Sequence, residues 1–191
     1  RVIVSSGVMF ASETKAGLLR HSERLIMVDA LGSSEAIGMA QNTTSADGES
    51  KTASFELGPN TKILTEDGRE VQPGSDEIGR VALKGNTPIG YYKDPEKSAK
   101  TFQVINGVRW SIPGDWASID ADGTVRLLGR GSQCINTGGE KVYPEEVEEA
   151  LKLHPTVADA AVVGVPDERF GQAITALVEP LPGQTIVEAD L

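Results

Sequence analysis

Residues 129–149 read Gly-Arg-Gly-Ser-Gln-Cys-Ile-Asn-Thr-Gly-Gly-Glu-Lys-Val-Tyr-Pro-Glu-Glu-Val-Glu-Glu, so a glycine loop that carries a lysine runs directly into a well-marked helix start. Pro144 suits the first turn of a helix, where a backbone N–H would have no partner, and the carboxylates of Glu145 and Glu146 favour the positive end of the helix dipole. This stretch predicts a helix from Pro144. The loop at Gly138-Gly139 precedes that helix, and glycines let a backbone pass close to a ligand because no Cβ intervenes.

The residues after this stretch extend it into an α+β unit. Val147, Ala150 and Leu151 recur at the spacing of one helical face, and His154-Pro155 disfavours helical geometry and ends the run. Two apolar segments then predict strands over residues 158–165 and 173–179, joined by a turn at Pro166-Asp167.

The first 128 residues predict a different arrangement. Residues 1–5 read as a strand, 12–20 as a helix with Ser12 as its N-cap, and 25–31 as a second strand, which resembles the end of an α/β layer. From about Asn60 short strands and turn signals predict a small β-rich, barrel-like subdomain. Its expected elements are strands over 61–66 and 77–84, a helix that Asp94-Pro95 caps and that ends near Phe102, and a hairpin of 116–120 and 124–128 around Asp122-Gly123.

Residues 129–134 carry two glycines and no apolar periodicity, so they are the candidate linker. The expected fold class is a mixture of α/β and α+β. Residues 1–128 would end a large domain, residues 129–134 would form a hinge, and residues 135–191 would begin a small, truncated α+β domain.

The composition is that of a globular, acidic protein. With 191 residues and 39% hydrophobic content the chain can bury a core, and its net charge of −10 argues against a nucleic-acid partner. The single Cys134 excludes an internal disulfide framework and, with no signal-like segment, favours the cytoplasm. No apolar run approaches the roughly 20 residues of a membrane helix, which excludes an integral segment and leaves peripheral membrane contact open.

Both ends of the sequence look cut. It opens on a β-branched run without an initiator methionine, and Thr185–Glu188 has a capping-box pattern although the chain stops at Leu191. A helix that short is not stable on its own. We therefore expect an internal piece of a longer protein.

Four segments in this order carry a family resemblance: Leu31-Gly-Ser-Ser-Glu35, Gly114-Asp115, Gly129-Arg130 and Asn136-Thr-Gly-Gly-Glu-Lys-Val-Tyr-Pro144. The set resembles the adenylate-forming superfamily of acyl-CoA synthetases, adenylation domains and luciferases, and it spans essentially the whole chain. The resemblance implies a fragment of an ATP-dependent acid–CoA ligase for a fatty or other hydrophobic carboxylic acid. Such enzymes use ATP, Mg²⁺ and coenzyme A, and they form an acyl adenylate before the thioester.

The resemblance also implies roles for residues before the linker. Gly32 would bind the nucleotide, Ser34 would contact its phosphates and Glu35 would hold Mg²⁺, with Ser34 and Glu35 as the catalytic pair. Asp115 would accept hydrogen bonds from the ribose hydroxyls, as a carboxylate can. Each has a plainer interpretation: Ser34 and Glu35 as a loop or helix cap after a strand, and Asp115 as a turn aspartate.

In the second part, Arg130 would contact ribose or phosphate oxygens, and Gly138, Gly139 and Lys141 would line the coenzyme A tunnel. A surface arginine and a solvated lysine are the plainer interpretations of Arg130 and Lys141. Gln133 lies where the family usually has an aspartate or lysine hinge, and it would serve that role without the charge.

Other residues depart from the family pattern or match it weakly. Leu31 replaces an aromatic that usually stacks near adenine, and Pro113 replaces a threonine, which puts nucleotide affinity rather than the assignment in doubt. Residues 5–9 match the family's adenine and acyl-pocket segment only weakly, and a strand-end loop explains them as well.

The sequence lacks the family's upstream phosphate loop and its downstream catalytic lysine, so the chain alone is expected to be inactive. Two alternatives stay open. One is an adenylating enzyme that loads a carrier protein or stops at the adenylate, and the other is a non-catalytic nucleotide-binding module.

Overall fold

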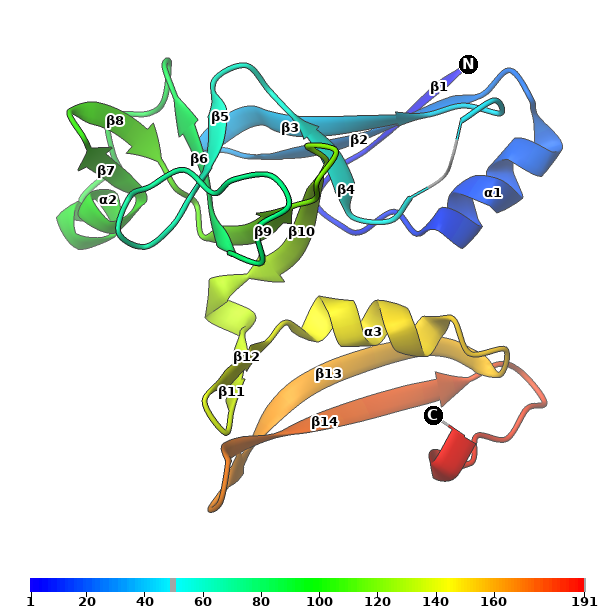
Figure 1. Ribbon diagram of the computed structural model, residues 1–191. Helices are drawn as coiled ribbons and strands as arrows, with labels where there is room; N and C mark the ends of the chain where they lie inside the picture. Colours follow the sequence, from blue (N-terminus) through cyan, green and yellow to red (C-terminus); the bar gives the residue numbers. More distant parts are fainter. Residues whose placement is uncertain (49–50, 191) are drawn as a thin grey trace. The chain divides into compact units, whose positions relative to one another are not determined.

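A computed structural model describes residues 1–48 and 51–190 of the chain (Figure 1). The chain divides into two compact units, Arg1–Leu127 and Leu128–Leu191, each with its own sheet. Together these units make a sheet-rich α+β protein with few helices, as the sequence predicts.

The first unit is built on a ten-stranded sheet with the order β1-β2-β3-β4-β10-β9-β6-β8-β7, in which β5 also pairs with β6. This order is open at both ends, so the described strands do not close the barrel that the turn-rich sequence suggested. The strands are β1 (Val2–Ser5), β2 (Ile26–Ser33), β3 (Ala36–Thr44), β4 (Ser54–Leu57), β5 (Thr61–Leu64), β6 (Gly79–Lys84), β7 (Phe102–Ile105), β8 (Val108–Ser111), β9 (Asp115–Ile119) and β10 (Val125–Arg130), and the helices are α1 (Ser12–His21) and α2 (Pro95–Thr101).

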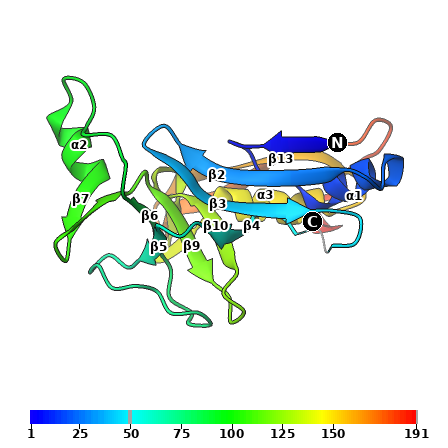
Figure 2. The same cartoon turned by 90° about the horizontal axis from the view of Figure 1, so that it is seen from above.

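The β1-α1-β2 segment has the predicted α/β character, because β1 and β2 are parallel and joined through α1. Figure 2 shows β1, β2 and β3 side by side. The predicted N-cap at Ser12 is wrong: Ala11 occupies the cap position, and the Ser12 hydroxyl donates to Glu13 Oε1 at 3.1 Å. A serine one position inside the helix still lies in its first turn, where its hydroxyl competes for local acceptors.

In the first unit four of the described strands were not predicted, namely β3, β4, β7 and β8. The β3 segment mixes Ala, Gly, Gln and Asn, which have low strand propensity, and it becomes a strand because β2 and β4 supply hydrogen-bonding partners on either side. Asn106-Gly107 joins β7 to β8, and both residues have positive φ, at 51° and 76°. Asn-Gly is a strong hairpin signal that was available in the sequence.

The predicted elements after Asn60 are present. Asp94 caps α2 by accepting a hydrogen bond from the Lys97 amide at 2.9 Å, and Asp122-Gly123 turns the chain between β9 and β10. The main core lies on the middle of the sheet and consists of Ala36, Met39, Ile63, Val71, Val81, Leu83, Ala117, Ile119 and Val125.

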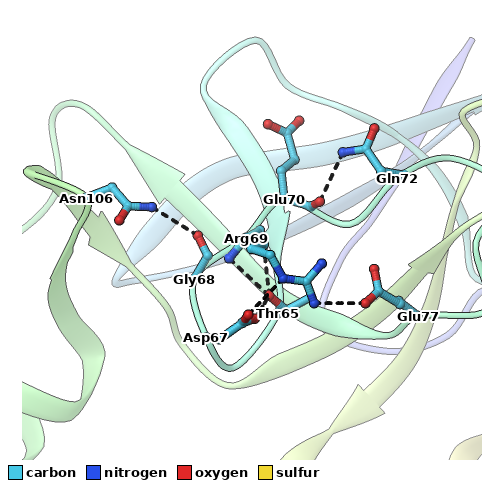
Figure 3. A network of polar contacts seen from close by, with 8 residues as sticks. All are labelled: Thr65, Asp67, Gly68, Arg69, Glu70, Gln72, Glu77 and Asn106. Carbon is cyan, nitrogen blue, oxygen red and sulfur yellow. Dashed lines mark hydrogen bonds and ion pairs between the residues drawn. The ribbon is translucent and has the colours of Figure 1, made fainter.

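A polar network holds the long loop between β5 and β6 (Figure 3). Arg69 is its centre: the amide donates to Thr65 Oγ1 at 3.0 Å, Nε pairs with Asp67 at 2.7 Å, and Nη2 pairs with Glu77 at 3.0 Å. Because the charged side chains of Arg69, Asp67 and Glu77 are exposed, their ion pairs order the loop more than they add to the free energy of unfolding.

The second unit contains a four-stranded sheet of order β12-β11-β14-β13. Its elements are the 3₁₀ turn η1 (Gly131–Gln133), β11 (Ile135–Thr137), β12 (Glu140–Val142), α3 (Pro144–Lys152), β13 (Val157–Asp167), β14 (Gly171–Pro180) and η2 (Glu188–Asp190). Within this unit α3 runs along β13 (Figure 1).

The helix start at Pro144 is confirmed, with Tyr143 at the cap position. Lys152 in the last turn of α3 forms an ion pair with Asp159 of β13, with 3.2 Å between Nζ and Oδ1. Glu148 Oε1 accepts a hydrogen bond from the backbone amide of Val162 at 2.8 Å. These two contacts anchor α3 to the sheet.

Two predictions in this unit need correction. Pro166 and Asp167 continue β13, with Pro166 opposite Gln172, and residues 168–170 make the turn. A proline is tolerated there because β13 is the edge strand of this sheet. Among the residues that the structure describes, the capping-box pattern at Thr185–Glu188 leads into the three-residue 3₁₀ turn η2, which begins at Glu188.

Candidate active site

Ser34 and Glu35 form the tight turn between β2 and β3. Ser34 is exposed and its hydroxyl donates to Glu35 Oε2 at 3.0 Å. Gly32 lies just before this turn, where a Cβ would stand 3.3 Å from the Ala36 carbonyl oxygen and the Gly38 nitrogen. The predicted nucleotide-contacting residues are therefore neighbours on one hairpin.

Glu35 is half-buried and held from two other elements. The Tyr91 hydroxyl donates to Glu35 Oε1, and the buried Ser111 hydroxyl donates to the Glu35 carbonyl oxygen at 2.7 Å. The Tyr91 hydrogen bond is the main reason that the pKa of Glu35 falls to about 2, and the Ser34 hydroxyl lowers the pKa further. Glu35 is thus a carboxylate at neutral pH.

Sequence reasoning missed Tyr91 and Ser111 because they lie 56 and 76 residues from Glu35. No local pattern encodes contacts at that separation. A tyrosine and a serine beside predicted strands have many ordinary uses in a core or a loop.

Asp115 is the first residue of β9 and is 9% exposed. Gly114 precedes it with a φ of 112°, a backbone conformation that side chains with a Cβ rarely adopt. Ser111, whose hydroxyl donates to the Glu35 carbonyl oxygen, lies four residues before Asp115 at the end of β8, the strand that precedes β9 in the sequence. The same chain segment thus runs from the Glu35 contact to Asp115.

In the second unit, Gly129 is buried with a φ of 133°, and a Cβ there would lie 2.7 Å from Glu145 Oε2. The backbone conformation favours glycine, whereas the Glu145 carboxylate is the end of a flexible side chain that can move aside. Arg130 follows at the exposed end of β10, and the exposed Gln133 ends η1.

Gly138 and Gly139 form the two-residue turn between β11 and β12, with φ values of 58° and 94°. Positive φ at both positions is typical of a type I′ hairpin turn. The Gly138 amide donates to the Phe170 carbonyl at 2.9 Å, and the exposed Lys141 stands opposite Asn136 in the hairpin register.

The structure brings Gly32, Ser34 and Glu35 together on one hairpin and links Glu35 to the segment leading to Asp115. Arg130, Gln133, Gly138, Gly139 and Lys141 belong to the other unit. Their predicted roles beside the nucleotide and coenzyme A stay predictions.

Among residues 1–48 and 51–190, no group of three or more His, Cys, Asp or Glu side chains is arranged to hold a metal ion. The donor at Glu35 is one ionised carboxylate. This suits Mg²⁺, which commonly takes one or two protein carboxylates and fills its other positions with phosphate oxygens and water. In the same described residues, no helix has the length and apolar character to cross a membrane.

The sequence of the chain is similar to those of known enzymes. Residues 146–191 match the model of the AMP-binding enzyme C-terminal domain. The chain is 48% identical, over its full length, to the medium/long-chain-fatty-acid–CoA/3-oxocholest-4-en-26-oate–CoA ligase of Mycobacterium marinum, of which it covers 35%. It is 47% identical over 99% of its length to the 3-oxocholest-4-en-26-oate–CoA ligase of Rhodococcus rhodochrous, of which it covers 34%.

A solved structure shares the fold. The ATP-bound crystal structure of MatB from Rhodopseudomonas palustris superposes with a TM-score of 0.81 at 31% identity, over 99% of this chain and 37% of that one. The chain therefore spans about a third of the length of the proteins it matches. Along its whole sequence, with the four motifs in order, the chain is therefore similar to a part of the adenylate-forming, AMP-binding enzymes, and the two relatives named above are acyl-CoA ligases.

Proposed function

We propose that this chain is part of an AMP-forming acid–CoA ligase. In the first step the carboxylate of the acid attacks the α-phosphorus of ATP and pyrophosphate leaves. In the second, the thiolate of coenzyme A attacks the acyl carbon and AMP leaves. The observation that carries the proposal is the ionised Glu35 beside Ser34 on the β2–β3 hairpin, in a chain 48% identical to a CoA ligase.

The first unit would bind the nucleotide. Glu35 would hold Mg²⁺, which when bound neutralises phosphate charge and orients the phosphates for displacement. The exposed Ser34 hydroxyl, which donates a hydrogen bond to Glu35 in this structure, would turn to donate to a phosphate oxygen. The backbone of Gly32 would lie beside the nucleotide. Asp115 would accept hydrogen bonds from the ribose hydroxyls, because an ionised carboxylate is an acceptor with two oxygens.

The second unit would act as a mobile small domain, with residues 1–128 in the large domain, 129–134 as the hinge and 135–191 as the start of the small domain. Two steps at one site require such a movement, and Gln133 would be among the few loop residues that absorb it. Arg130 would contact ribose or phosphate oxygens. Gly138 and Gly139 would let the pantetheine arm pass, with Lys141 beside it.

The acid would be a fatty acid or another hydrophobic carboxylic acid. Support comes from the names of the two relatives, which act on medium and long fatty acids and on a steroid acid. A cytoplasmic location would fit the single Cys134, and peripheral contact with a membrane would give access to such acids.

Mass spectrometry of the full-length protein that carries this chain tests the proposal. The protein is incubated with ATP, Mg²⁺ and coenzyme A and with short, medium and long fatty acids, a steroid acid and an aromatic acid. We expect acyl-CoA from the hydrophobic acids, and acyl-AMP when coenzyme A is left out. Glu35→Gln is expected to lose both products by about 10²-fold or more, as for removal of a group that stabilises the transition state.

The two alternatives give different products. Acyl-AMP that persists with coenzyme A present but disappears with an acyl-carrier protein would identify a carrier-loading enzyme. ATP binding without either product across the whole panel would identify a non-catalytic nucleotide-binding module. Either result would contradict the ligase proposal.

A further inference from the structure

The two oxygens of the Glu35 carboxylate have different partners. Oε1 accepts from Tyr91, a half-buried residue of the loop before α2. Oε2 accepts at 3.0 Å from Ser34, an exposed residue of the same turn. One oxygen is therefore held by a distant element, and the other faces a hydroxyl that is free to rotate.

Tyr91 is itself fixed at both ends. Its amide donates to Ser98 Oγ at 2.7 Å, and Ser98 Oγ in turn donates to the Asp94 carbonyl at 2.6 Å, which ties Tyr91 to the N-terminal turns of α2. Its ring packs against Phe102 with 5.7 Å between ring centroids, and Lys97 Nζ lies 4.1 Å from the Tyr91 ring centroid. The position of the hydroxyl is thus set before any ligand binds.

The backbone of the turn is held as well. Ser111 is fully buried on β8, and its hydroxyl reaches the Glu35 carbonyl oxygen at 2.7 Å. Tyr91 and Ser111 together restrain the side chain and the main chain of one residue.

We propose that Tyr91 is a positioning residue of the cation site: it restrains Glu35 through Oε1 and so would keep the carboxylate oriented for the cation that accompanies ATP. This inference rests on the proposed role of Glu35. The physical basis is preorganisation, because a carboxylate already restrained in one rotamer loses less entropy when it binds a cation. Groups that orient metal ligands typically change metal affinity by about 10-fold to 100-fold when they are removed.

Tyr91→Phe removes the hydroxyl and keeps the ring, so the packing on Phe102 and the contact with Lys97 stay. Tyr92→Phe is the matched control, because Tyr92 is the next residue, is 88% exposed and contacts Lys93, whose Nζ lies 5.2 Å from its ring centroid. Both variants are made in the full-length protein. Isothermal calorimetry then measures ATP binding at a series of Mg²⁺ concentrations, and steady-state kinetics measures the Mg²⁺ concentration for half-maximal activity.

For Tyr91→Phe we expect that about tenfold more Mg²⁺ is needed both for half-maximal ATP binding and for half-maximal activity. At saturating Mg²⁺ its kcat should lie within about twofold of that of the unaltered protein. Tyr92→Phe should match the unaltered protein. An equal response to Mg²⁺ in the two variants would overturn the proposal. So would a lower kcat for Tyr91→Phe with unchanged Mg²⁺ dependence, since that pattern belongs to a purely structural tyrosine.

Glu35→Gln separates this inference from the assignment on which it rests. If Glu35→Gln keeps the normal Mg²⁺ dependence, the proposed role of Glu35 fails, and the role of Tyr91 fails with it. If Glu35→Gln loses Mg²⁺-dependent binding while Tyr91→Phe behaves like Tyr92→Phe, the role of Glu35 stands and only the role of Tyr91 is wrong. Thermal unfolding of each variant confirms that a folded protein was measured.

Discussion

Lys15 is completely buried in the middle of α1, although charged side chains are rarely buried without a partner. Its Nζ pairs with Asp29 of β2, donates to the Lys51 carbonyl at 2.7 Å and lies 5.5 Å from the Phe10 ring centroid. Asp29 Oδ1 has no hydrogen-bond partner within the described residues, so its charge is neutralised chiefly by Lys15. This buried ion pair connects α1 to β2, which pairs in parallel with β1.

Replacing Lys15 with methionine is expected to lower the free energy of unfolding by about 3–5 kcal/mol, because it leaves the Asp29 charge buried without compensation. Urea unfolding of the 191-residue chain measures the loss. The double variant Lys15→Met with Asp29→Leu should recover most of it. A loss of no more than about 1 kcal/mol in the free energy of unfolding for Lys15→Met would show that the ion pair does not hold α1 against the sheet.

Glu35 gives a pH-dependent contribution to stability. Its pKa in the folded protein is about 2, against an ordinary value of 4.5, so the stabilisation is fully present above about pH 4.5 and disappears as the pH falls towards 2. Tyr91→Phe removes the main cause of the shift and should raise the pKa of Glu35. We expect it to lower the free energy of unfolding by about 1–2 kcal/mol at pH 7, and this deficit should shrink as the pH falls through that window.

Chemical denaturation of both proteins between pH 2 and pH 7 would show the effect, with Tyr92→Phe as the comparison. A deficit that stays constant, or that grows on acidification, would mean that the Tyr91 hydroxyl stabilises the fold through some contact other than the ionised Glu35.

At the scale of elements, the start of α3 depends on a glycine outside the helix. Gly129, with a φ of 133°, packs against the Glu145 carboxylate, and the helix then runs over β13, where Lys152 and Glu148 attach it. The sequence placed this helix correctly because Pro144 and the acidic first turn are local signals. It did not predict β3, because the residues of that strand have little intrinsic preference for an extended chain and become a strand only beside their neighbours in the sheet.

Gly129→Ala is expected to cost about 1–3 kcal/mol, since it combines an unfavourable backbone conformation with a Cβ 2.7 Å from Glu145 Oε2. Gly183→Ala is the comparison: its φ is 79°, and nothing lies within 4 Å of the added Cβ, so it adds backbone strain alone. Hydrogen exchange of the amides in α3 measures the difference. Equal protection of α3 in the two variants would show that the contact with Glu145 does not hold the helix start.

At the scale of the whole molecule, the predicted site residues are divided between two units. Ser34, Glu35 and Asp115 lie in the first, and Arg130 and the Gly138-Gly139 turn lie in the second. The chain also spans only about a third of the length of its relatives. A complete adenylation site would need the positively charged groups of the phosphate loop and the catalytic lysine, which the motif set in this chain lacks.

The 191-residue chain alone is therefore expected to form acyl-AMP at least 10²-fold more slowly than the full-length protein, since loss of one preorganised group at a charged transition state commonly costs about 10² in rate. Release of AMP that depends on the added acid measures the rate. The comparison uses equal concentrations of the two proteins with saturating ATP and Mg²⁺. AMP release from the chain at a rate near that of the full-length protein would contradict the expectation.

The sequence by itself determined the resemblance to adenylate-forming enzymes, the mixed fold class, the helix at Pro144, the cap at Asp94 and the glycine loop before the Pro144 helix. These depend on short-range signals: a cap, a proline, a charge at a helix end, or a turn that requires positive φ. Only the tertiary structure showed that Tyr91 and Ser111 hold Glu35 and that Lys15 pairs with Asp29 in the interior. Those contacts join residues far apart in the chain, and their free energy comes from burial and from fixed geometry, which exist only after the strands have assembled into a sheet.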